Sequence, residues 1–66
     1  MLIVNGKPLE LNPIPSTVEE LIEHLGLGDR RVMVEKNAEI LDPEQHSTEQ
    51  LTNGDRIEIV HFVGGG

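Results

Sequence analysis

The chain has 66 residues, a length that allows one domain with a small hydrophobic core. Hydrophobic residues make up 36% of the sequence and Phe62 is the single aromatic residue, so aliphatic side chains must supply most of the buried surface. Twelve acidic residues against 5 basic residues give a formal net charge of -7. This charge repels phosphate backbones and anionic lipids, so we expect no binding to nucleic acid or membrane and instead a basic partner surface.

The sequence contains no cysteine, which excludes disulfides, thiolate metal ligands and cysteine nucleophiles. The first residues, MLIVNGK, lack a basic segment followed by a long apolar stretch, and no segment approaches the length needed to span a membrane. We therefore expect neither a signal peptide nor an anchor, and a cytoplasmic location.

The first predicted elements form a hairpin. The short apolar segment Leu2–Val4 predicts a strand, and Asn5-Gly6 is the dipeptide that best supports a tight hairpin turn. Residues Pro8–Leu11 return as the second strand. Two prolines within residues 12–15 then end the pairing, because proline lacks the backbone donor that a strand ladder needs.

A helix follows the hairpin. Thr17 is a favourable N-cap residue, and Gly26 is suited to the left-handed conformation that ends a helix. Between them, one apolar stripe has helical spacing and consists of Val18, Leu21, Ile22 and Leu25.

Three more strands complete the pattern. We predict strands over residues 32–36 and 39–41, a polar loop with a turn of 3₁₀ helix over residues 42–50, and a last strand over Arg56–Phe62. We expect the main core residues to be Ile3, Leu21, Ile22, Val32, Val34, Ile57 and Ile59.

The order of these elements indicates the fold. Two strands, one helix and three strands predict an α+β protein in which a mixed sheet packs on one main helix. If the first and last strands pair in parallel, the right-handed crossover rule makes this a β-grasp roll. We assign residues 1–63 to the β-grasp domain and residues 64–66 to a flexible C-terminal glycine tail.

No internal active site is predicted. His24, His46 and His61 lack metal-ligand spacing, and the loop position of His46 predicts a solvated side chain. Ser16 and Thr17 are explained by helix capping rather than by nucleophilic catalysis. We therefore expect neither a metal nor a cofactor.

The end of the chain is the chemically distinctive feature. The glycines at positions 64, 65 and 66 have no Cβ atoms, so they can thread a narrow channel and place the Gly66 carboxylate in another protein's active site. A carboxylate is a poor acyl donor until it is activated, most readily as a mixed anhydride with AMP. Sulfur can then displace AMP and leave a nucleophilic thiocarboxylate on Gly66.

The last strand also offers a docking surface. If alternation holds, Val60 and Phe62 lie on the face opposite Ile57 and Ile59 and are partly exposed, which suggests a docking patch for partner proteins. Val63 is assigned to the same docking arm. The alternative is a register shift or bulge that turns these side chains inward.

These features resemble the ThiS family, the ubiquitin-like sulfur carriers of thiamine biosynthesis, over essentially the whole chain. The resemblance is carried by LIVNGK, TVEELIEHLGL, VMVEKNAEI, NGDRIEIVHFV and the terminal glycines. It implies a protein co-substrate rather than an enzyme, with Gly65 and Gly66 as the functional pair of the tail. Gly64 departs mildly from the family pattern, because relatives can carry another small residue there.

The resemblance also implies the partners. They are an ATP-dependent activating enzyme of the ThiF type, a thiazole synthase of the ThiG type and a sulfur donor system. The free protein is expected to be a monomer. Two alternatives remain open, namely a sulfur carrier for molybdopterin synthesis and a ubiquitin-like interaction module whose glycines are not reactive.

Overall fold

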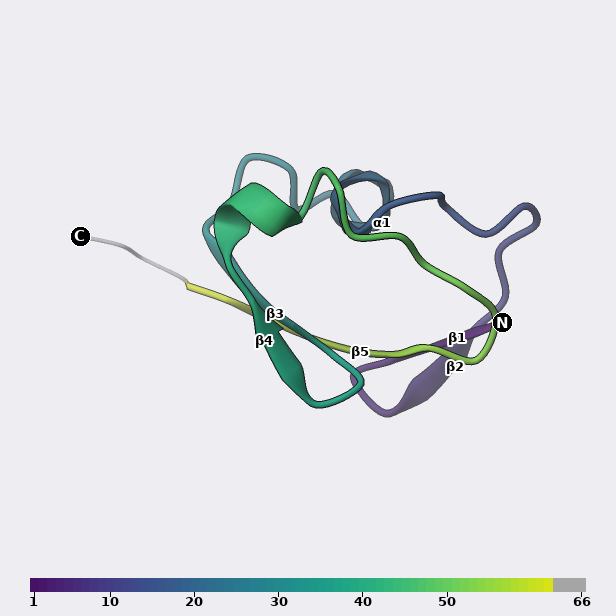
Figure 1. The fold of residues 1–66 in the computed structure, drawn as a ribbon. Helices are drawn as coiled ribbons and strands as arrows, with labels where there is room; N and C mark the ends of the chain where they lie inside the picture. Colours follow the sequence, from purple (N-terminus) through teal and green to yellow (C-terminus); the bar gives the residue numbers. More distant parts are fainter. Residues whose placement is uncertain (63–66) are drawn as a thin grey trace.

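The computed structural model describes residues 1–62 and shows a mixed sheet with one main helix (Figure 1). In chain order the elements are β1 (Leu2–Val4), β2 (Lys7–Leu9), α1 (Val18–His24), β3 (Val32–Lys36), β4 (Glu39–Leu41), the 3₁₀ helix η1 (Pro43–Gln45) and β5 (Arg56–His61). None of the helices in this part of the chain is long and apolar enough to cross a membrane.

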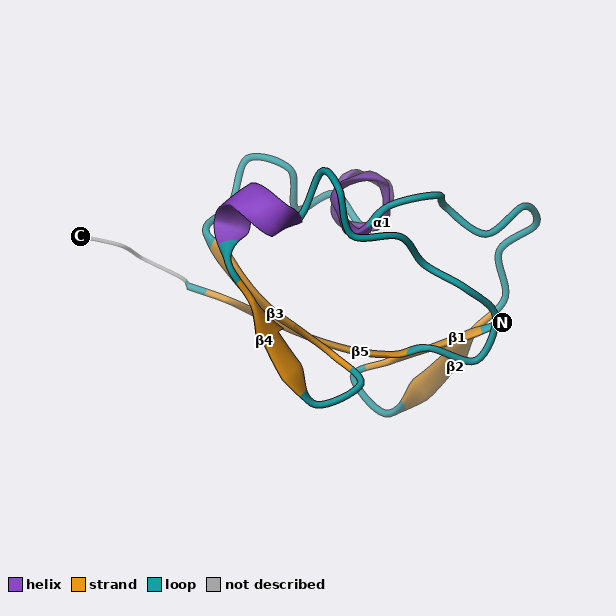
Figure 2. Ribbon diagram, viewed as in Figure 1, coloured by secondary structure: helices purple, strands orange, loops and turns teal. Residues whose placement is uncertain are grey.

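The five strands lie in the order β2-β1-β5-β3-β4. β1 pairs with β5 in parallel, and the other neighbouring strands pair antiparallel. Both helices lie on one side of the sheet, as Figure 2 shows. We call the side that faces α1 the inner face and the opposite side the outer face. The predicted α+β class and β-grasp roll are confirmed.

The second strand of the first hairpin begins and ends earlier than predicted. Asn5 and Gly6 have φ angles of 51° and 80°, as a tight two-residue hairpin turn requires. This turn pairs Val4 directly with Lys7, so β2 begins at Lys7 instead of Pro8 and ends at Leu9 instead of Leu11.

Helix α1 begins and ends as predicted. The Thr17 hydroxyl accepts a hydrogen bond from the Glu20 N–H at 3.2 Å, and Gly26 adopts φ 77° beyond the last turn. The Glu19 N–H in the first turn donates to the backbone carbonyl of His46 at 2.8 Å. This bond ties the loop after η1 to the start of the helix.

The core lies between α1 and the inner face of the sheet. Its apolar side chains are buried and consist of Leu2, Val18, Leu21, Ile22, Val34, Leu41, Leu51, Ile57 and Ile59. Two expected members differ. Ile3 is only half-buried, because Leu2 faces the core and alternation places Ile3 on the outer face. Val32 is half-buried and packs against the edge of the core.

The prediction that His46 is solvated is wrong. Its side chain is buried, with 9% of the residue exposed, and its Nε2 atom has no hydrogen-bond partner within residues 1–62. The loop around it packs against the start of α1, where the His46 carbonyl accepts a hydrogen bond from the first turn of the helix.

Candidate functional site

The candidate site begins with β5, the strand that leads to the predicted glycine tail. β5 lies at the centre of the sheet, between β1 and β3, and it ends on the side of the molecule away from the amino terminus (Figure 1). Pairing with β3 continues to Val32 and His61, and the Phe62 N–H then donates to the Arg31 carbonyl at 3.1 Å. β3 and Arg31, the residue before it, therefore hold the chain up to the last described residue.

The other side of β5 is supported over a shorter length. β1 pairs only with Arg56 and Ile57, and the side chain of Asn5 then extends this support by one step. The Asn5 Oδ1 atom accepts a hydrogen bond from the Ile59 N–H at 2.7 Å. Within residues 1–62, no strand pairs with β5 on this side beyond Ile59, so its last residues are held from one side.

The predicted outer-face residues of β5 lie where the sequence indicates. Val60 and Phe62 are 51% and 57% exposed, while Ile57 and Ile59 are buried. The unbroken register of β5 with β3 rules out the alternative of a register shift or bulge. That Val60 and Phe62 dock a partner is a prediction that this geometry permits.

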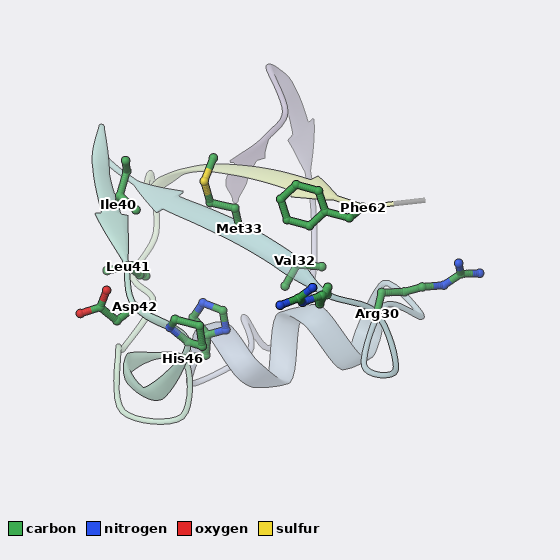
Figure 3. A pocket seen from close by; sticks show the side chains of 10 residues that line it. Arg30, Val32, Met33, Ile40, Leu41, Asp42, His46 and Phe62 are labelled. Atoms are coloured by element: carbon green, nitrogen blue, oxygen red, sulfur yellow. The ribbon is translucent and has the colours of Figure 1, made fainter. Parts of the chain in front are cut away.

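Sequence reasoning missed two neighbours on the same face. Met33 is paired directly with Val60, and Ile40 lies on β4 with 65% of the residue exposed. Figure 3 shows both side chains pointing away from the side on which Val32 and His46 lie. The alternation of buried and exposed positions along residues 32–36 is the signal that could have identified Met33.

A groove opens beside this surface. Its volume is about 730 Å³, and its lining includes Met33, Ile40 and Phe62 from the outer face together with the buried His46. Arg30 also borders the groove, but its side chain extends away from the centre (Figure 3). The groove is therefore mainly apolar and adjoins the last described residue of the chain.

The predicted reactive end lies outside the described residues. Val63, assigned to docking, and Gly64, Gly65 and Gly66, assigned to the tail and its reactive carboxylate, all belong to this segment. Their roles stay predictions.

A polar cluster fixes the start of β5. The Asp55 carboxylate accepts hydrogen bonds from the Thr52 N–H at 2.8 Å and from the Asn37 side chain at 3.1 Å. Burial of Asp55 acts to raise its pKa, but the hydrogen bonds from Thr52 and Asn37, together with the positive charge of Lys36, outweigh burial and leave the pKa below its ordinary value. The Asn37 Oδ1 atom accepts a bond from the Arg56 N–H at 3.0 Å, so the cluster also joins the β3–β4 turn to β5.

An ion pair fastens the long loop to β3. The Lys36 Nζ atom lies 2.7 Å from a carboxylate oxygen of Glu49 and donates to the Gln50 carbonyl at 3.0 Å. The hydrogen bond to Glu49 is the main cause that raises the pKa of Lys36. In the described part of the chain, no group of three or more His, Asp or Glu side chains is placed to hold a metal ion.

Comparisons with known proteins agree on one family. The sequence model of the ThiS family matches residues 2–66. The chain is 41% identical to the sulfur carrier protein ThiS of Bacillus subtilis over 66 residues, which is 100% of both chains. It is 38% identical over 65 residues to a thiazole synthase of Paramagnetospirillum magneticum, covering 98% of this chain and 20% of that protein.

A solved structure extends the agreement to three dimensions. The crystal structure of the thiamine biosynthesis protein ThiS from Geobacter metallireducens superposes with a TM-score of 0.81 at 37% identity, covering 98% of this chain and 97% of the other. With one family matched over nearly the whole sequence and the same fold in a solved member, the chain belongs to the ThiS family.

Proposed function

We propose that this protein is a sulfur carrier of thiamine biosynthesis whose C-terminal glycine carboxylate is adenylated and converted to a thiocarboxylate. One observation carries the proposal, namely the match to a sulfur carrier protein ThiS over 100% of both chains. This match includes the terminal glycines, where the reactive group is expected. Of the two carrier branches considered from the sequence, the relatives named above favour thiamine over molybdopterin.

The proposed chemistry takes place on Gly66. Its carboxylate oxygen attacks the α-phosphorus of ATP, which forms an acyl adenylate and releases pyrophosphate. A hydrosulfide equivalent from the sulfur donor then attacks the carbonyl carbon, the bond to AMP breaks, and a thiocarboxylate remains. Transfer of this sulfur to an acceptor completes the role of the chain, which supplies no catalytic group of its own.

The proposed partners follow from this chemistry. An ATP-dependent activating enzyme of the ThiF type forms the adenylate, a sulfur donor system supplies sulfur, and a thiazole synthase of the ThiG type consumes the thiocarboxylate. The thiazole synthase with a segment similar to this chain over 20% of its length supports the last of these. Because these steps use ATP and the chain lacks cysteine, we place the protein in the cytoplasm.

In this proposal the body and the tail have separate tasks. Residues 64–66 thread the channel of a partner, since glycine has no side chain to obstruct it. Val60, Phe62 and Val63 dock the body beside that channel. The exposure of Val60 and Phe62, and the one-sided support of the end of β5, are the observations that favour this division.

Intact-mass measurement tests the proposed function. The protein is incubated with ATP, the activating enzyme and a sulfur donor, and the expected result is the replacement of one oxygen by sulfur at Gly66. A variant with one Ala added after Gly66 is the control, because it should keep its circular dichroism spectrum and lose activation.

Two results would contradict the proposal. One is an unchanged mass under conditions that charge a known carrier. The other is efficient charging of the extended variant, which would rule out threading of the tail. If the protein is instead a non-reactive interaction module, deletion of Gly65 and Gly66 should leave its function unchanged.

A further inference from the structure

The outer face of the sheet carries two carboxylates directly opposite each other. Glu35 on β3 is the register partner of Glu58 on β5. Two positions further along, a backbone hydrogen bond from the Asn37 N–H to the Arg56 carbonyl at 2.8 Å continues the hydrogen-bonded pattern. Glu35 and Glu58 therefore form a hydrogen-bonded pair of the ladder, with Cα atoms about 5.5 Å apart and side chains on the same face.

This arrangement is unfavourable in the free protein. Like charges directly opposite each other on a sheet are destabilising. The one ion pair within residues 1–62 is Lys36 with Glu49, so neither Glu35 nor Glu58 is neutralised by an ion pair there. Arg56 lies two positions from Glu58 on the same face, but it forms no ion pair with either carboxylate.

Apolar side chains lie beside the acidic pair. On the outer face, the next pair toward the end of β5 is Met33 with Val60, and Ile40 is the β4 partner of Glu35. Met33, Ile40 and Val60 are all among the exposed large hydrophobic residues. A protein that covers this face removes water from around the two carboxylates. Because the carboxylates then lose their hydration, a cation on the partner stabilises them more strongly than it would in water.

The negative charge of this face indicates which kind of protein surface binds there. A second copy of the chain would bring another acidic pair and another net charge of -7 to the same face. An arginine side chain fits better, because its planar guanidinium presents several donors at once and can bridge two carboxylates. Its weak hydration also suits an apolar surrounding.

We propose that the outer face of β3, β4 and β5 binds a protein surface that inserts an arginine side chain between Glu35 and Glu58, beside the exposed apolar side chains of Met33, Ile40 and Val60. The partner is the thiazole synthase that receives the tail, so this inference rests on the proposed function. The acidic pair lowers the stability of the free carrier and gives the docking face its specificity.

Binding measurements on matched variants test the proposal. The affinity of the thiazole synthase from the same organism is measured for the wild-type protein and for Glu35→Gln, Glu58→Gln and the double variant. Each single substitution should weaken binding roughly tenfold, since it replaces a charged carboxylate beside the arginine with a neutral amide that keeps only one acceptor oxygen. The double variant should lose less than the product of the two single effects, because both carboxylates hold one guanidinium.

A matched control separates this contact from general charge attraction. Glu19→Gln removes the same charge from the exposed surface of α1, on the other side of the sheet, and should leave the affinity within about twofold. The same loss for Glu19→Gln, or wild-type affinity for both Glu35→Gln and Glu58→Gln, would overturn the proposal. Absence of binding by the wild-type protein would overturn the choice of thiazole synthase as partner.

The free protein provides an independent readout of opposite sign. Glu35→Gln and Glu58→Gln should each raise the melting temperature by roughly 3 °C through loss of like-charge repulsion, so weaker binding cannot be attributed to unfolding. A drop in melting temperature for both variants would contradict the unfavourable pairing. Dimers of the wild-type protein that tighten in Glu58→Gln would assign the face to self-association instead.

The two hypotheses fail in different ways. If the wild-type protein is not charged with sulfur, the proposed function fails whatever the Glu35 and Glu58 variants do. If the wild-type protein is charged and donates sulfur while the variants bind like wild type, only the arginine contact is wrong.

Discussion

At the scale of single residues, Ala38 occupies a backbone conformation that suits glycine. It has φ 73° in the turn between β3 and β4, where an L-residue with a Cβ atom is strained by roughly 1 kcal/mol. We expect Ala38→Gly to raise the free energy of unfolding by about 0.5 to 1 kcal/mol in urea titrations.

The equivalent turn between β1 and β2 supplies the matched control. Gly6 has φ 80°, and a Cβ atom placed there would meet nothing within 4 Å. Gly6→Ala should therefore lower the free energy of unfolding by about 1 kcal/mol through backbone strain alone. If both substitutions changed stability in the same direction, the strain assigned to Ala38 would be incorrect.

Asp55 makes the stability of the fold depend on acid pH. Hydrogen bonds keep its folded pKa below the ordinary value, so its contribution is fully present above the unfolded pKa of about 3.9 and is lost as the pH falls through the folded pKa. Asp55→Asn should lower the free energy of unfolding by about 1 to 2 kcal/mol at pH 7. The free energy of unfolding of this variant should also fall less steeply than that of the wild-type protein between pH 6 and pH 2.5. An unchanged pH profile would show that other carboxylates set the acid limit.

Residue by residue, the sequence predicts burial well where alternation or helical spacing is clear. Ile57 and Ile59 are buried and Val60 and Phe62 are exposed, as their pattern indicates. His46 and Ile3 were predicted incorrectly because neither position is decided by local spacing. His46 is buried because its backbone carbonyl caps the start of α1. Ile3 is turned outward by the register of β1.

At the scale of elements, turn and cap residues placed the strands and the helix. Thr17 caps the start of α1 and Gly26 follows its last turn, as expected. The Asn5-Gly6 turn forms the first hairpin. The predicted limits of β2 are wrong because a two-residue turn starts the pairing at Lys7, one residue before Pro8, where the sequence predicts the strand to begin.

The loop between β4 and β5 is fastened by one ion pair, and its strength can be measured. Lys36 and Glu49 are both half-buried, so a double-mutant cycle with Lys36→Met and Glu49→Gln should give a coupling energy of about 0.5 to 1 kcal/mol. Because the pKa of Lys36 is raised, this contribution is fully present below the unfolded pKa of about 10.4 and is lost as the pH rises through the higher folded pKa. A coupling energy near zero would mean that the loop is held by its backbone bonds alone.

At the scale of the whole molecule, element order predicts the β-grasp roll once one pairing is assumed. That assumption is the parallel pairing of the first and last strands, and β1 does pair with β5 in parallel. The apolar surface that joins Met33 and Ile40 to Val60 could not be predicted in the same way, because it depends on which strands become neighbours.

The surface of the free protein also sets its state of association. The net charge of -7 and the acidic pair on the exposed apolar face both oppose contact between two copies. Sedimentation at low salt should show a monomer. Dimerisation that increases as salt is removed would contradict this prediction, since electrostatic repulsion is strongest at low ionic strength.

The central position of β5 has a mechanical consequence. A partner that pulls on the carboxyl end applies force along the axis of a strand flanked by β1 and β3. The hydrogen bonds of both ladders run across the strand axis, so they bear that force together in shear instead of opening one after another. The body can thus withstand traction on its end without unravelling, much as two glued strips resist sliding better than peeling.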